Sequence, residues 1–106
     1  MEIKGQFHFG LEYEGGMLRD FCLRVPTLAD VEEAIEAAQA EAGEAASAPR
    51  IERHKWALCL TVEGVPSHKL TADLLGTLPA REWSVLRDAE DELLKKLAAG
   101  TAPAAD

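Results

Sequence analysis

The stretch FHFGLEYEGG, residues 7–16, decides the fold, because apolar side chains occupy every second position up to a pair of glycines. A period of two is typical of a half-buried β-strand, and Gly15 and Gly16 can take the positive φ angles of a tight turn. Residues 21–25, FCLRV, alternate in the same way after the turn. Residues 5–25 are therefore predicted to form an N-terminal β-hairpin. The alternative is a flexible extended arm, because an isolated hairpin has little stability.

A helix is predicted directly after the hairpin, over residues 28–42. Pro26 ends the second strand, and Thr27 with Asp30 three residues later resembles a capping box. Apolar side chains fall on one side of this segment and acidic side chains on the other. The acidic face is explained by exposure to solvent, but it would also suit a partner that is steered by charge.

The middle of the chain has less distinct signals. Residues 43–49 are small and flanked by helix breakers, which predicts a mobile connector. In the segment 51–63, residues 56–62 alternate as in a strand, yet the run is long enough for a buried helix. Periodicity alone leaves both structures open for this segment.

Two further helices are predicted, over residues 72–76 and 79–99. Thr71 caps the first, and Pro79 opens the second at a first-turn position, where its missing N–H costs nothing. Residues 101–106 are predicted to be a disordered tail. The sequence thus predicts an α+β fold, an N-terminal β-hairpin followed by about three α-helices. These elements form a single, mainly helical domain of residues 1–100.

Charge and size limit the classes of function. The chain has 106 residues and a net charge of −8, so phosphate would repel it, and nucleic acid and anionic membrane are not expected partners. No run approaches the ~20 apolar residues of a membrane span, and the N-terminus lacks a signal-peptide pattern, which predicts a cytoplasmic protein. A domain of this size has little room for a deep active-site cleft, which favours a binding module.

Side chains capable of chemistry are few and scattered. Cys22 and Cys59 have no partner at metal-ligand spacing and are interpreted as reduced, apolar side chains. His8, His54 and His68 lie in different segments without a motif partner. A nucleophile pair of Cys59 and His54 would need an oxyanion hole, of which the sequence gives no sign. We therefore predict that the protein is not an enzyme and has no catalytic residue, no metal and no cofactor.

Trp56 and Trp83 are interpreted first as core residues and second as anchors for a partner protein. Glu90 interrupts the apolar stripe of the last helix. Either it bends outward into water, or this part of the stripe is exposed and meets a partner. The candidate partner-binding residues are Phe7, Phe9, Tyr13, Trp56, Trp83, Leu86 and Glu90.

Two stretches of the sequence resemble a known family. RDFCLRVPTLAD, residues 19–30, is similar to the strand that leads into an acidic helix in the tail assembly chaperones of Mu-like and P2-like phages. LTADLLGTLP, residues 70–79, is similar to the stretch before the last helix of the same family. The resemblance covers roughly residues 7–97, most of the chain.

The resemblance implies a morphogenesis protein of a phage or prophage, which acts in the host cytoplasm and is absent from the finished particle. Such chaperones keep the tape measure protein soluble and help to recruit the tail tube protein, so both are expected partners, and self-association is left open. An apolar surface would cover the amphipathic helices of a tape measure protein before the tube encloses them. The family also implies that residues 51–62 are helical. The alternative function is a structural subunit of a phage tail or of a related contractile particle.

Overall fold

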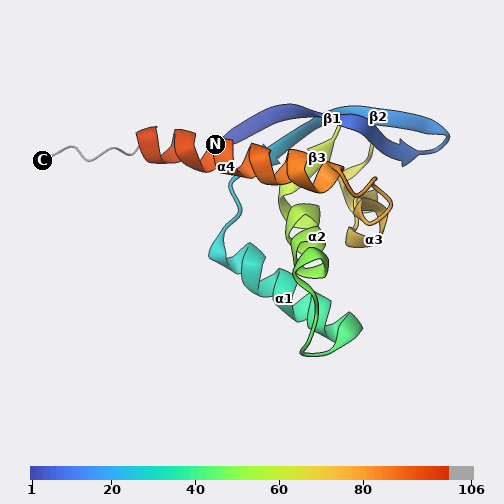
Figure 1. Cartoon of the computed structure of the whole chain (residues 1–106), viewed down its shortest axis with the longest axis vertical. Coiled ribbons are helices and arrows are strands. Elements are labelled where there is room, and N and C mark those ends of the chain that lie inside the picture. Colours follow the sequence, from blue (N-terminus) through green and yellow to red (C-terminus); the bar gives the residue numbers. More distant parts are fainter. Residues whose placement is uncertain (101–106) are drawn as a thin grey trace, which may run out of the picture.

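The computed structural model describes residues 1–100 and has an α+β fold with an N-terminal antiparallel hairpin (Figure 1). The hairpin-first α+β fold predicted from the sequence is therefore confirmed. The predicted tail, residues 101–106, lies outside the described residues. The elements in chain order are β1 (Glu2–Tyr13), β2 (Gly16–Arg24), α1 (Leu28–Ala42), α2 (Ala48–Cys59), β3 (Leu60–Val62), a 3₁₀ turn (Ser67–Lys69), α3 (Ala72–Leu75) and α4 (Glu82–Gly100).

The hairpin turn is one residue earlier than the glycine pair suggested. Glu14 (φ 50°) and Gly15 (φ 82°) form its centre. Gly16 already pairs with Tyr13 in the ladder between β1 and β2. Two successive positive φ angles define the type I′ turn, whose twist matches that of the flanking strands. Within residues 1–100 the sheet is antiparallel with the strand order β1-β2-β3.

β1 is irregular in its middle. The register to β2 shifts between Gln6 and Leu11, so that residues 7–10 stand opposite a single residue of β2. Phe7 and Leu11 are both 0% exposed, whereas Phe9 between them is 54% exposed. The prediction that Phe9 shares the buried face of its neighbours is therefore wrong, because the bulge breaks the alternation of the strand.

The segment 51–63, for which the sequence left helix and strand open, contains both: most of it belongs to α2, and residues 60–62 form β3. α2 begins at Ala48, after Ser47 as N-cap, and ends at Cys59. Residues 60–62 then pair as β3 with residues 21–23 of β2. The helix that the family resemblance implies over residues 51–62 is wrong at both ends. It starts too late, because the last residues of the predicted connector belong to α2, and it ends too late, because Leu60 completes the sheet.

The predicted capping box at the start of α1 is confirmed. The Thr27 hydroxyl accepts a hydrogen bond from the backbone N–H of Asp30, and the Asp30 carboxylate accepts one from the backbone N–H of Thr27 at 2.8 Å. Asp30 also pairs with the guanidinium of Arg24 at 2.7 Å. Arg24 in turn donates to the carbonyl oxygen of Leu58 at 2.9 Å. These contacts join the end of β2, the start of α1 and the end of α2.

Asp30→Ala is expected to lower the free energy of unfolding by about 1 kcal/mol, because it removes a cap acceptor and an ion pair with a 45% exposed arginine side chain. The Arg24 guanidinium and the backbone N–H of Thr27 hold the pKa of Asp30 well below its ordinary value of 3.8. The stabilisation is therefore present at neutral pH and is lost as the pH falls through the folded-state pKa. Urea unfolding at neutral pH measures the loss. Glu36→Ala, at an exposed site on α1, is the control, and an equal loss in both variants would contradict the role of Asp30.

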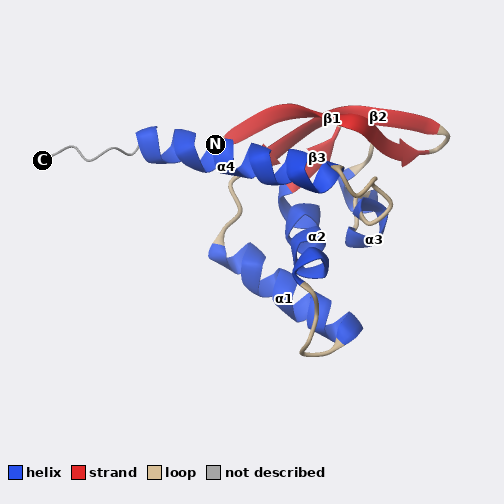
Figure 2. Ribbon diagram, in the orientation of Figure 1, coloured by secondary structure: helices blue, strands red, loops and turns tan. Residues whose placement is uncertain are grey.

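α1 and α2 pack against each other and extend away from the sheet, whereas α4 runs along it (Figure 2). Ala34 and Ala38 bury the inner side of α1. Where the end of α1 meets α2, the Glu41 carboxylate pairs with Arg50 at 2.9 Å and with His54 at 3.0 Å. An acidic side chain near the end of the first helix, Glu41, is thus used in contacts within the protein.

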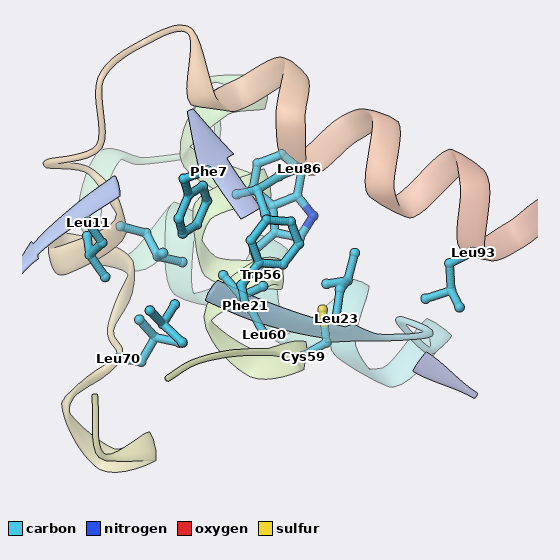
Figure 3. Close-up of a cluster of buried hydrophobic side chains, with 12 residues drawn as sticks. Phe7, Leu11, Phe21, Leu23, Trp56, Cys59, Leu60, Leu70, Leu86 and Leu93 are labelled. Carbon is cyan, nitrogen blue, oxygen red and sulfur yellow. The ribbon is translucent and has the colours of Figure 1, made fainter. Parts of the chain in front are cut away.

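One cluster of buried side chains joins the sheet, α2 and α4. The rings of Phe7 and Phe21 lie 4.8 Å apart on the inner face of the sheet. Figure 3 shows Leu86 and Leu93 extending from α4 into the same cluster, with Trp56 beside Leu86. Trp56 is 2% exposed, so α2 is held to the sheet and to α4 through its largest side chain.

Candidate protein-binding pocket

A pocket of about 310 Å³ lies where α2, α3 and the start of α4 meet. α2 begins at Ala48 after its N-cap Ser47, and Thr71 caps α3 as predicted. α4 begins at Glu82 and not at Pro79 as predicted, because residues 79–81 form a link and turn before it. We call this hollow the α2–α4 pocket. It is lined by Pro49, Arg53, Trp56, Leu75, Gly76, Leu78, Pro79, Ala80, Trp83 and Leu86.

Two tryptophans form one wall of the pocket. The rings of Trp56 and Trp83 meet edge to face, with centroids 5.3 Å apart and an interplanar angle of 69°. This is a favourable arrangement for an aromatic pair. Trp56 belongs to the core, whereas Trp83 is only partly buried. The structure thus brings together three of the candidate residues, Trp56, Trp83 and Leu86.

Glu90, a fourth candidate, is engaged inside the protein. Its carboxylate accepts hydrogen bonds from Trp56 Nε1 at 3.0 Å and from Lys55 Nζ at 2.9 Å. Lys55 is 7% exposed and also pairs with Glu52 at 2.8 Å. Burial alone would lower the pKa of Lys55, but the two carboxylates outweigh it and raise that pKa. The interpretation that Glu90 bends outward into water is therefore wrong, because the carboxylate turns inward and accepts hydrogen bonds from Trp56 and Lys55.

Two arginines stand beside the tryptophans. Arg53 lines the pocket, and its Nη1 donates to the carbonyl oxygen of Ala72 at 3.1 Å. Gly76 leaves the space for this guanidinium, since a Cβ at Gly76 would lie 2.5 Å from Arg53 Nη1. The Arg87 guanidinium lies over the ring of Trp83, 5.7 Å from its centroid, which is cation–π geometry.

Glu82 is a fully buried carboxylate that the sequence did not single out. It accepts hydrogen bonds from the backbone N–H groups of His8 at 2.9 Å, Phe9 at 2.8 Å and Gly10 at 3.0 Å. Burial opposes its ionisation, but these three donors outweigh burial and lower the pKa of Glu82. A signal was present in the sequence. Glu82 precedes Leu86 by four residues and so continues the apolar stripe of α4.

The other candidate residues lie in β1. Phe7 is in the core against Phe21, Phe9 is exposed at the bulge, and Tyr13 is half-buried beside the hairpin turn. Sequence reasoning did not identify the rest of the pocket, because no local pattern marks residues that only the packing of α3 and its neighbours brings together. These missed residues are Pro49, Arg53, Leu75, Gly76, Leu78, Pro79 and Ala80.

His54 and Cys59, considered above as a nucleophile pair, each bind a different partner. His54 is bound to Glu41 at 3.0 Å, while Cys59 Sγ donates to the carbonyl oxygen of Lys55 at 3.3 Å. Burial raises the pKa of Cys59 to about 12, the opposite of an activated thiol. Cys22 and Cys59 are both free thiols. Within residues 1–100, no three His, Cys, Asp or Glu side chains gather into a group that could hold a metal ion.

No protein-family model, no curated protein and no solved structure matches this chain. Among the helices of residues 1–100, none combines the length and the apolar character needed to cross a lipid bilayer.

Proposed function

We propose that this chain is a tail assembly chaperone of the Mu-like and P2-like type. It binds the tape measure protein in the host cytoplasm, and it helps to recruit tail tube subunits, during assembly of a phage or prophage tail. The observation that carries the proposal is the α2–α4 pocket, an apolar hollow of about 310 Å³ with Trp56 and Trp83 in its wall.

The chemistry of the pocket suits a protein helix. Apart from Arg53, its lining residues carry no charge. Amphipathic helices bind such hollows through apolar side chains spaced three or four residues apart, and tryptophan is among the residues that contribute most to protein interfaces. A tape measure protein presents helices of this kind until the tail tube encloses them, and covering their apolar stripes would keep the protein soluble.

Co-expression with the tape measure protein of the same phage tests the proposal. We expect the soluble fraction of the tape measure protein to rise several-fold, the two proteins to copurify, and this chain to be absent from purified tails. A structural subunit, the alternative function, would instead remain in purified tails. If the chain neither bound the tape measure protein nor changed its solubility, the proposal would be wrong.

A variant that fills the pocket links this activity to the site. Ala80 lines the pocket and is exposed, so Ala80→Trp is expected to keep the fold while it occupies the space of a partner side chain. The solubility of the tape measure protein should then fall towards its level without the chaperone. Ala45→Trp, in the exposed loop between α1 and α2, is the matched control and should leave it unchanged. Equal activity of both variants would place the binding site elsewhere.

A further inference from the structure

We infer that the α2–α4 pocket selects a partner helix that carries a large apolar side chain and, one turn away, a carboxylate. The apolar side chain enters the hollow, and the carboxylate binds the arginines beside it. The inference rests on the proposed function for the identity of the partner, and it adds the chemistry by which the bound segment is recognised.

Local charge favours an acidic segment although the protein itself is acidic. The net charge of −8 repels acidic peptides from most of the surface. The charged residue that lines the pocket, however, is an arginine, Arg53. Arg81 is exposed directly after Ala80, and Arg87 is exposed over the ring of Trp83. Arg53 and Arg87 therefore place positive charge beside the tryptophans of the pocket, and Arg81 follows the lining residue Ala80 in the sequence.

Nearby carboxylates do not cancel these arginines. Glu82 is turned away to the backbone of β1, and Glu90 is bound to Lys55. Asp73 and Asp88 are exposed, and within residues 1–100 neither forms an ion pair with Arg53, Arg81 or Arg87. The arginines thus complement a carboxylate that a partner would supply.

Arg53 is positioned for this role. The carbonyl oxygen of Ala72 accepts from its Nη1 at 3.1 Å, and Gly76 leaves the space that the guanidinium occupies. A guanidinium has five N–H donors in a planar fork, so one bond to a carbonyl oxygen leaves it able to bind a carboxylate as well. A partner helix seated against the apolar walls would exclude water, which strengthens such an ion pair.

The size of the pocket fits side chains better than a whole organic cofactor. A volume of about 310 Å³ is at the small end of the range for ligand pockets. It accepts one or two large apolar side chains while the backbone of the partner helix remains outside. The anchor then supplies most of the affinity, and the ion pair supplies orientation and specificity.

The two tryptophans give a direct measurement, since the chain has only Trp56 and Trp83 and both line the pocket. The probes are two synthetic helical peptides of about 18 residues, without Trp or Tyr, that share one Leu/Phe stripe. They differ only in whether Glu or Lys stands four residues after the central Phe. We expect the dissociation constant of the Glu peptide to be about tenfold lower at low salt, with a smaller ratio at high salt.

Charge reversal assigns this preference to the pocket. The double variant Arg81→Glu with Arg87→Glu is expected to remove the preference for the Glu peptide. The double variant Lys95→Glu with Lys96→Glu makes the same change of charge at exposed sites near the other end of α4 and should retain it. Circular dichroism establishes that both proteins are folded.

The outcomes of these measurements separate the inference from the proposed function. Equal affinity for the two peptides, or an equal loss of preference in both double variants, would overturn the inference. Tape measure binding that is unaffected by reversal of Arg81 and Arg87 would overturn it as well and would leave the proposed function intact. Peptide selectivity without any tape measure binding would contradict the proposed function and leave the recognition chemistry standing.

Discussion

Glu82→Ala is expected to lower the free energy of unfolding by about 3 kcal/mol, because three hydrogen bonds to a fully buried carboxylate are lost at once. In the wild-type protein the carboxylate accepts hydrogen bonds from the backbone N–H groups of His8, Phe9 and Gly10, at distances of 2.8 to 3.0 Å. The bulge takes these groups out of the regular ladder to β2. Alanine would leave them facing the apolar stripe of α4, where an unpaired donor costs about 1–3 kcal/mol.

Urea unfolding and amide hydrogen exchange measure this effect. Beyond the loss of stability, we expect the amides of residues 8–10 to exchange faster than those of β2. Glu82→Gln keeps one acceptor oxygen and should lie between the wild type and Glu82→Ala. Glu92→Ala, exposed on the same helix, should change stability by less than about 0.5 kcal/mol. If Glu82→Ala cost no more than this control, Glu82 would not hold the bulge.

The same carboxylate makes the fold sensitive to acid. The three N–H donors outweigh burial and keep the pKa of Glu82 below its ordinary value of 4.5. The unfolded chain therefore takes up this proton at a higher pH than the folded protein does. The stabilisation is complete above the unfolded-state pKa and is lost as the pH falls through the folded-state pKa. As the pH falls from the ordinary pKa of 4.5 through the lower folded-state pKa, Glu82→Ala should lose less stability than the wild type.

The hairpin and α1 could be predicted because their signals are local. Alternation over residues 7–13 marks a strand, and Thr27 and Asp30 mark a helix start within four residues. The bulge in β1 could not be predicted in this way. The side chain that satisfies it, Glu82, lies 74 residues after His8 in the sequence, so only the tertiary fold reveals why Phe9 leaves the core.

The junction of α2 and β3 marks the limit of periodicity. Trp56 and Leu60 are four apart, as on one face of a helix, while Leu60 and Val62 are two apart, as on one face of a strand. Both spacings bury the same side chains. Whether residues 60–62 continue the helix or form a strand depends on residues 21–23 of β2, which pair with them. This is a long-range contact that the local sequence does not reveal.

The pocket was predictable only in part. Trp56 and Trp83 could be selected because tryptophans are large and rare, and they do lie together. Ala80 and Leu78 have no distinguishing feature in the sequence. Their place in the wall follows from how the link between α3 and α4 folds over α2.

Glu90→Ala is expected to lower the free energy of unfolding by about 2 kcal/mol, because it leaves two buried donors short of an acceptor. Trp56 Nε1 would lose its acceptor at 3.0 Å. Lys55 would keep Glu52 but lose its second carboxylate, so part of its burial would no longer be compensated. The loss is smaller than for Glu82→Ala because Lys55 retains one partner.

Glu90→Gln separates the two contributions. A glutamine side chain can still accept from Trp56 but carries no charge for Lys55, so about half of the loss should remain. A double-mutant cycle of Glu90→Ala with Lys55→Met isolates the coupling between the carboxylate and the ammonium group. Asp91→Ala, exposed on the next position of α4, is the control.

The consequence for binding follows from the place of Trp56 in the wall of the α2–α4 pocket. Without Glu90 the indole is no longer fixed at its Nε1 edge, and its contact with Trp83 is expected to become less uniform. Tryptophan emission should then shift to longer wavelength, and the Glu peptide should bind more weakly even where the protein is fully folded. Emission and affinity that both matched the wild type would show that the Glu90 hydrogen bond does not shape the pocket.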